Sequence, residues 1–248
     1  MKTNRMKVRE EIAGFCRKVA FSQTAVQLCE KKAKSGEEMF LHLTLKKELE
    51  HREEVRKARL LKEAGFPVYK TLEGYDYKDI KIPASLRSDE MVSGSFIRLK
   101  RNIVLYGPVG AGKSHLAIAL GVAACSMDIP VRFFSVAELV VKLSEAVRTG
   151  TLERLLKSIL KAELIILDEW GYVPLDKQGA QLLFRIISDS YERRSLVITT
   201  NLEFSKWGTV LTDDQLAAAI IDRLAHHGHL IIFERDSYRM KNALMKQK

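Results

Sequence analysis

A glycine-rich octapeptide between an expected strand and an expected helix is the segment best suited to chemistry. It follows the pattern G-x-x-x-x-G-K-[ST], after the β-favouring residues 103–106 and before an amphipathic helix over residues 114–125. Glycines allow backbone N–H groups to point inward around phosphate oxygens, and the N-terminus of the helix adds partial positive charge. We expect Lys113 to reach the β- and γ-phosphates of a nucleotide and the Ser114 hydroxyl to bind Mg²⁺. The predicted phosphate-binding residues are Gly107, Pro108, Val109, Gly110, Ala111, Gly112, Lys113, Ser114 and His115.

Two carboxylates and an amide follow two other expected strands. Residues 164–167 are apolar on both faces, which indicates a central parallel strand, and they lead into Asp168 and Glu169. Because the carboxyl ends of parallel strands border the ligand crevice, we expect Asp168 to hold Mg²⁺ through water and Glu169 to polarise an attacking water. Asn201 ends another strand, where its amide could hold that water or the γ-phosphate. Taken alone, the Asp-Glu pair would be a solvated strand end and the asparagine a turn residue.

Several arginines could neutralise the charge that develops on the γ-phosphate, including one supplied by a neighbouring subunit. Arg223 lies late in an expected helix, Arg239 opens the last expected helix, and Arg193 and Arg194 precede a strand. A surface salt bridge is the alternative for each of them.

The run His226-His227-Gly228-His229 is a cluster of possible metal ligands. No matching set of cysteine, histidine or carboxylate stands beside it at the spacing of a zinc site. We interpret the run as a connection between a helix and a strand.

Strands and helices alternate after the octapeptide, as in a three-layer α/β fold. We predict further strands over residues 131–135, 164–167, 196–200 and 230–233, with helices over residues 136–147, 152–161, 176–191 and 213–225. Residues 66–101 read as a linker, in which Tyr77 and Ile80 could cover an adenine or simply pack.

Residues 1–65 carry helical patterns and almost no β signal. Ser22 can cap one helix, and Ser35 with Glu38 forms a capping box that opens a long helix ending at Ala64. The expected apolar face of that helix is Met39, Phe40, Leu43, Leu49, Val55 and Leu60. Its basic residues, the candidates for phosphate contacts on double-stranded DNA, are Lys46, Lys47, Arg52, Arg56, Lys57 and Arg59. Interleaved glutamates leave an ordinary solvated face as the alternative.

The charge of the chain favours a polyanionic partner. The formal net charge is +10, and residues 1–70 contain 17 Lys and Arg against 10 Asp and Glu. We expect a helical domain for DNA or a partner over residues 1–66, a linker and adenine-side segment over 67–101, and an ATPase domain over 102–248. Three widely spaced cysteines fit reduced thiols in the cytoplasm, and neither a secretory signal nor a membrane-spanning segment is expected.

Four segments together resemble the IstB family, the AAA+ helper ATPases of bacterial insertion sequences and relatives of the DnaC and DnaI helicase loaders. They are GPVGAGKS, LIILDEWGYVPLD, YERRSLVITTN and IIDRLAHHGHLIIFERDSYRMK, and the similarity covers nearly the whole chain. The resemblance implies an AAA+ P-loop fold with a five-stranded parallel sheet in the order 5-1-4-3-2. With this resemblance we also expect a small all-helical N-terminal domain before it and no full C-terminal lid. It also implies ATP with Mg²⁺, ATP-dependent self-assembly on double-stranded DNA, and targeting or activation of a partner transposase.

The same resemblance assigns roles by position. Asn201 looks like the sensor-1 residue, Arg223 like the arginine finger, and Arg239 like the sensor-2 arginine, while Trp170 stands where the family often has leucine. We therefore predict an ATPase that forms homo-oligomers through ATP-bridged interfaces and is reset by hydrolysis. One alternative is a helicase loader whose N-terminal helices grip a replicative helicase. A second is a small-molecule kinase, against which Glu169 and Asn201 argue.

Overall fold

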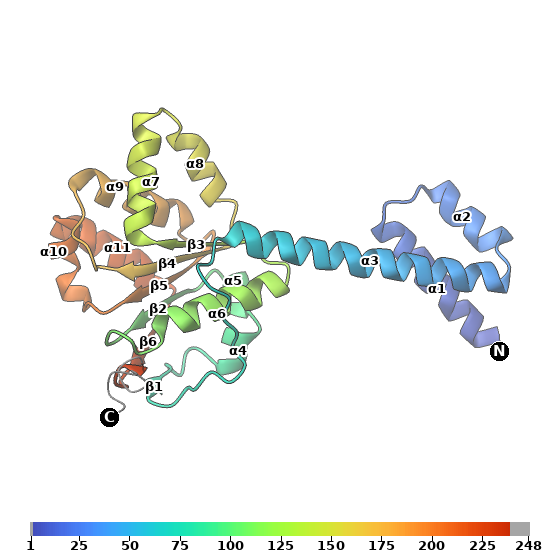
Figure 1. The fold of residues 1–248 in the computed structure, drawn as a ribbon, viewed down its shortest axis with the longest axis horizontal. Helices are drawn as coiled ribbons and strands as arrows, with labels where there is room; N and C mark the ends of the chain where they lie inside the picture. The colour runs from blue at the N-terminus through green and yellow to red at the C-terminus, as the bar shows by residue number, and fades with distance from the viewer. Residues whose placement is uncertain (1, 239–248) are drawn as a thin grey trace, which may run out of the picture. The chain divides into compact units, whose positions relative to one another are not determined.

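The computed structural model describes residues 2–238, so Arg239 lies outside the described residues (Figure 1). Internal contacts divide the chain into two units, Met1–Arg59 and Leu60–Lys248. The first unit is helical, and the second is a sheet with helices on both faces. Among residues 2–238, every helix is too short or too polar to cross a membrane.

Three helices carry the N-terminal unit: α1 (Lys2–Lys18), α2 (Gln23–Lys32) and α3 (Ser35–Ala64), of which α3 continues into the second unit. The Ser22 hydroxyl accepts the Ala25 N–H at 3.3 Å, so the expected cap of α2 is present. The helices share a small core of Ile12, Cys16 and Leu45. Three helices around so few fully buried side chains depend on polar contacts as well.

The capping box expected at Ser35 is wrong. Helix α3 begins at Ser35 itself, and Glu37, rather than Glu38, reaches back to accept the Lys34 N–H at 2.7 Å. Glu38 is 2% exposed and pairs instead with Arg5 and Arg9 of α1, at 2.7 and 2.6 Å. The hydrogen bond from Arg5, followed by that from Arg9, lowers the pKa of Glu38 despite its burial.

The expected apolar face of α3 is wrong for four of its six residues, while Leu49 is half-buried and Leu60 is buried, as expected. Met39, Phe40, Leu43 and Val55 are exposed, whereas Leu45 is buried. The buried face follows Glu38, Leu41, His42 and Leu45, which have helical spacing, so it is displaced from the face that Met39, Phe40 and Leu43 form.

Six strands form the sheet of the second unit, in the order β1-β6-β2-β5-β4-β3. The strands are β1 (Ile80–Lys81), β2 (Asn102–Tyr106), β3 (Val131–Ser135), β4 (Leu164–Trp170), β5 (Ser195–Thr200) and β6 (Gly228–Phe233). The five strands from β6 to β3 are parallel and have the expected order 5-1-4-3-2. The expected count of five misses β1, which the linker adds as an antiparallel edge strand against β6. Two residues are too few to leave a strand pattern in the sequence.

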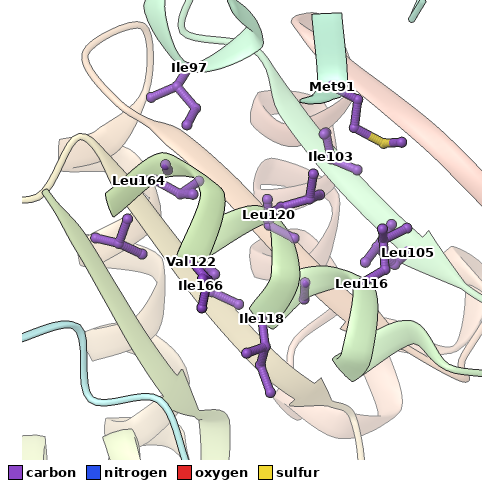
Figure 2. Close-up of a cluster of buried hydrophobic side chains, with 14 of the residues drawn as sticks. Met91, Ile97, Ile103, Leu105, Leu116, Ile118, Leu120, Val122, Leu164 and Ile166 are labelled. Atoms are coloured by element: carbon purple, nitrogen blue, oxygen red, sulfur yellow. The ribbon is translucent and has the colours of Figure 1, made fainter. Parts of the chain in front are cut away.

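Helix α6 (Lys113–Ser126) packs on one face of the sheet, together with the linker helices α4 (Ser88–Val92) and α5 (Ser95–Arg98). Figure 2 shows Leu116 and Leu120 of α6 above the strands of this face. The other face is covered by α7 (Val136–Arg148), α8 (Leu152–Ile159), α9 (Lys177–Ser190), α10 (Trp207–Leu211) and α11 (Asp214–His226), with the 3-10 turn η1 (Phe204–Lys206) before α10.

Alternate residues of β4 enter these two cores, as its apolar pattern predicts. Leu164 and Ile166 face α6, while Ile165 and Leu167 face the other layer. All four are fully buried. The strand that carries Asp168 is therefore held rigidly at the centre of the three layers.

Candidate nucleotide-binding site

The glycine loop connects β2 to α6 at the carboxyl edge of the sheet. Gly107 has φ +150° and Gly110 has φ +80°, values that glycine adopts without strain. A Cβ on Gly107 would lie 2.5 Å from the carbonyl oxygen of Phe233, so β6 packs directly against the start of the loop. The loop therefore has the open backbone and the helix N-terminus that phosphate binding requires.

Lys113 is buried at the base of this loop, with 6% of its surface exposed. Its ammonium donates to the carbonyl oxygens of Gly107 and Pro108, at 2.8 and 2.7 Å. These bonds hold the charge inside the curve of the loop. A phosphate in that curve would offer the ammonium a stronger, charged acceptor.

Asp168 links the ends of β4 and β5 to the first turn of α6 in one polar network. Its Oδ1 accepts from the Ser114 hydroxyl at 2.8 Å and from the Thr199 hydroxyl at 2.5 Å. The Thr199 oxygen in turn accepts the Glu169 N–H at 3.0 Å. The structure thus brings the two predicted magnesium ligands, Ser114 and Asp168, within hydrogen-bond distance. Hydroxyl and carboxylate oxygens are the donors that Mg²⁺ prefers.

Glu169 lies in a bulge of β4. Leu167 pairs with Ile198 but Trp170 pairs with Thr200, so β4 contains one extra residue. Glu169 itself has φ +62°, an uncommon conformation for a non-glycine residue, and its side chain is exposed. The bulge turns the carboxylate out of the packed layers, at the carboxyl edge of the sheet where the phosphate loop also begins.

The bulge also explains where Trp170 goes. Its side chain is 1% exposed and packs against Trp207 with ring centroids 4.8 Å apart. Trp170 is therefore a core residue of the layer that covers β4 and β5, and it does not line the site.

Asn201 follows β5, which lies between β2 and β4, so it stands between the loop and Asp168. The residue is half-buried, and its Oδ1 is buried without a hydrogen-bond partner among the described residues. An unsatisfied amide oxygen is costly, and a bound water would satisfy it.

Arg235 and Tyr75 form a clasp over the loop that the sequence analysis missed. Arg235 donates to the Ala111 carbonyl at 2.6 Å, to the Asp76 carbonyl at 2.8 Å and to the Tyr75 hydroxyl at 2.9 Å. The Tyr75 hydroxyl donates to the Gly112 carbonyl at 3.2 Å. Burial raises the pKa of Tyr75 to about 12, so it remains a neutral donor.

His115 lies under the same clasp. Its ring contacts that of Tyr75 at 5.1 Å, and its Nε2 lies 3.3 Å from the Thr71 carbonyl oxygen. The aromatic pair Tyr75 and Tyr77, with centroids 5.0 Å apart, is the sequence signal that could have drawn attention to this segment.

Arg223 is not near the phosphate loop of its own chain. Asn102, at the amino end of β2, donates to the Arg223 carbonyl at 3.5 Å, whereas the loop begins at the other end of that strand. Five residues of strand separate the two by roughly 15 Å. The Arg223 side chain donates to the Ala219 carbonyl and lies 5.0 Å from the centre of the Phe184 ring.

Arg194, another candidate, donates to the carbonyls of Leu160 and Asp189, at 2.7 and 3.0 Å. These contacts describe a structural arginine that fixes the turn before β5.

Several of the basic residues named for DNA form ion pairs with glutamates of α3. Lys47 pairs with Glu50, Arg52 with Glu48 and Lys57 with Glu53. Lys46, Arg56 and Arg59 are exposed residues of the same helix. Local pairing reduces the field of this helix, so its basic surface is weaker than the residue count indicates.

Comparison with known proteins fits the geometry. The family model described as IstB-like ATP binding protein matches residues 17–246. The protein named as the ATP-binding protein of insertion sequence IS21 from Pseudomonas aeruginosa is 37% identical over 82% of this chain and 76% of its own length. The ATP-binding protein of insertion sequence IS5376 from Geobacillus stearothermophilus is 33% identical over 84% of this chain and 83% of its own length.

Solved structures agree on the fold. The DnaC helicase loader superposes with a TM-score of 0.54 at 21% identity, over 66% of this chain and 96% of that one. DnaA from Aquifex aeolicus bound to AMPPCP superposes with a TM-score of 0.56 at 24% sequence identity. The superposition covers 71% of this chain and 53% of the DnaA chain. The expected P-loop AAA+ fold is confirmed, and the chain belongs to the family of IstB-like ATP-binding proteins.

Proposed function

We propose that this protein is the ATP-dependent helper of an insertion sequence, and that it hydrolyses ATP to control its own assembly on double-stranded DNA. The observation that carries the proposal is the network of Ser114, Asp168 and Thr199 beside the buried Lys113. Relatives named as insertion-sequence ATP-binding proteins support the biological setting.

Each polar group of the site has a role in this proposal. The loop amides and Lys113 bind the β- and γ-phosphates, and Ser114 and Asp168 hold Mg²⁺, which supplies charge stabilisation at the phosphates. Glu169 accepts a proton from the attacking water, which its exposed position permits. The unsatisfied Oδ1 of Asn201 accepts a hydrogen bond from the same water.

A neighbouring subunit supplies the arginine. Arg223 lies at the opposite edge of the sheet from its own loop, so it can act only on the nucleotide of another copy. ATP then bridges two subunits, and assembly depends on the nucleotide. Arg239 remains a proposal for the sensor-2 role, since it lies outside the described residues.

A mixing experiment tests this arrangement. K113A should lose ATP binding, and E169Q should bind ATP but hydrolyse it about 10²–10⁴-fold more slowly. R223A should bind ATP without hydrolysing it. Mixed with K113A, it should regain hydrolysis, because the intact Arg223 of one subunit meets the intact loop of the other. If the mixture assembles yet stays inactive, Arg223 is not a finger that acts between subunits; R193A is the matched arginine control.

We propose that the N-terminal unit contributes the DNA contacts. K46Q with R56Q should lower affinity for duplex DNA and reduce the slope of log K against log salt by about 1–2. The control is K157Q with K161Q, which removes the same charge from exposed positions of the second unit. Equal losses from both double variants would assign DNA binding to net charge alone.

The partner transposase requires a separate contact surface, for which α3 offers exposed apolar side chains. Met39, Phe40 and Leu43 are 51%, 73% and 53% exposed on consecutive turns. A replicative helicase is also a protein, so the same apolar surface equally supports the second candidate function, that of a helicase loader. Capture of purified transposase or replicative helicase by wild-type protein and by F40A separates the two candidates.

A further inference from the structure

Two turns at the amino-terminal edge of the sheet bring a carboxylate beside two imidazoles. Glu192 lies in the turn between α9 and β5, and His226 and His227 end α11 just before β6. One nitrogen of each imidazole and one carboxylate oxygen lie within 4.8 Å of one another, and all three side chains are exposed. Glu192 and His226 are 34 positions apart in the chain, so the sequence alone does not reveal this grouping.

The distances within the cluster are close to those between two ligands of one metal ion. His227 Nε2 lies 3.2 Å from Glu192 Oε1, and the two imidazole centroids are 4.0 Å apart. Two ligands bound to zinc at about 2.0–2.1 Å in a tetrahedron lie about 3.3 Å apart. Small side-chain rotations are therefore enough to bring all three atoms to one ion.

Tyr191 orients one of the imidazoles. Its hydroxyl oxygen lies 2.6 Å from His226 Nδ1. When Nδ1 carries the proton and donates it to this oxygen, the Nε2 lone pair is available to a metal. Metal-binding histidines use such a second hydrogen bond to set their tautomer and ring orientation.

The backbone beneath the ligands is held in place. The His227 carbonyl accepts the Asn102 N–H at 2.8 Å, and the Ser190 carbonyl accepts the N–H groups of Arg193 and Arg194 at 3.0 and 2.9 Å. Glu192 has φ +56°, which this turn stabilises. His229, the third histidine of the run, is buried and lies 3.0 Å from the Ser85 hydroxyl, so it belongs to the core.

We propose that Glu192, His226 and His227 bind a zinc ion or a similar divalent transition-metal ion. Two imidazoles with one carboxylate suit such an ion, and the exposed position leaves the fourth site to water. The ion joins the turn before β5 to the end of α11, where His226 and His227 lie three and four residues after Arg223. If the proposed role of Arg223 holds, metal occupancy would also stiffen the helix that presents it.

Calorimetric titration of Zn²⁺ into nucleotide-free full-length protein tests the site, in a buffer without phosphate or chelator. We expect saturable binding of one zinc ion, weakened about 10-fold or more in both E192Q and H227Q. H51Q, which removes an exposed histidine of α3, should bind as the wild type does. Zinc should raise the melting temperature of the wild type by about 2–4 °C and leave both ligand variants unchanged.

Two results would overturn the proposal. Wild-type protein that binds no zinc would mean that the cluster is only an ion pair beside stacked rings. Zinc binding that persists undiminished in E192Q and H227Q would mean that the ion sits elsewhere, for example on cysteine thiols. Because neither measurement uses ATP or DNA, failure here is distinct from failure of the proposed function.

Discussion

Replacing Thr199 with valine tests whether the strand-end network positions the Asp168 carboxylate. The Thr199 side chain is nearly the same size as valine, and the residue is 2% exposed. Its hydroxyl donates to Asp168 and accepts the Glu169 N–H, so the substitution removes both bonds at constant volume.

The expected effect of T199V on stability follows from the two hydrogen bonds that it removes. A hydrogen bond to a charged group contributes about 1.5–3 kcal/mol and one between neutral groups about 0.5–1.5 kcal/mol. We therefore expect T199V to lower the free energy of unfolding by about 2–4 kcal/mol. Losing an outer-shell partner of a metal ligand costs about 10–100-fold in metal affinity or activity, so the Mg²⁺ concentration for half-maximal ATP hydrolysis should rise by that factor.

T200V is the matched control on the same strand. The Thr200 hydroxyl donates to the Trp170 carbonyl at 2.9 Å and accepts the Leu202 N–H at 3.0 Å, and the residue is 1% exposed. Its loss removes two neutral bonds, which should cost about 1–3 kcal/mol without altering the Mg²⁺ requirement. Tryptophan fluorescence during urea unfolding reports on this unit, because Trp170 and Trp207 both lie in its core.

The decisive comparison is the Mg²⁺ titration of the two variants. If T199V and T200V needed the same Mg²⁺ concentration as the wild type, Thr199 would only stabilise the fold. The assignment of Asp168 to the metal would then lose its support from this network.

Four further substitutions probe the loop and the N-terminal unit. G107A should lower the free energy of unfolding by more than about 2 kcal/mol, because the added Cβ would meet the Phe233 backbone. A Cβ added at Gly14 of α1 would meet no atom within 4 Å, so G14A should raise the free energy of unfolding by about 0.5–1 kcal/mol. R235Q should weaken ATP about 10-fold or more in a fluorescent-nucleotide titration, because its charge-assisted bond to the loop is lost; an unchanged Kd would dismiss the clasp. Because the pKa of Glu38 is lowered from 4.5 in the folded state, its stabilisation is complete above that value. It is lost as pH falls through the lowered pKa, and helical circular dichroism of E38Q should lack this acid transition.

The N-terminal unit illustrates where local patterns mislead. Ser35 and Glu38 have capping-box spacing, yet the Glu38 carboxylate is drawn to Arg5 and Arg9, about 30 residues earlier in the chain. A paired and buried carboxylate outweighs a cap of about 1 kcal/mol. The side of α3 that carries Glu38 is the side that α1 covers, so this side is the buried face of the helix.

Glu169 shows the same limit within the P-loop fold. Its position after an apolar run predicts that it lies at the carboxyl end of a central parallel strand. The bulge that exposes it, with φ +62°, depends on register with β5 and on Thr199 accepting its N–H. A pattern with period two carries no signal for a single extra residue.

The sequence by itself determined the phosphate loop, the parallel order of five strands and the family, because these depend on short backbone motifs and on apolar runs read along the chain. Only the tertiary structure decided that Arg235 clasps the loop from 124 residues away, that Arg223 lies at the end of β2 opposite the phosphate loop of its own chain, and that Glu192 lies beside His226 and His227. Those contacts arise where β-strands and their connecting turns meet at the two edges of one sheet, and the spacing of residues along the chain does not encode which turns become neighbours.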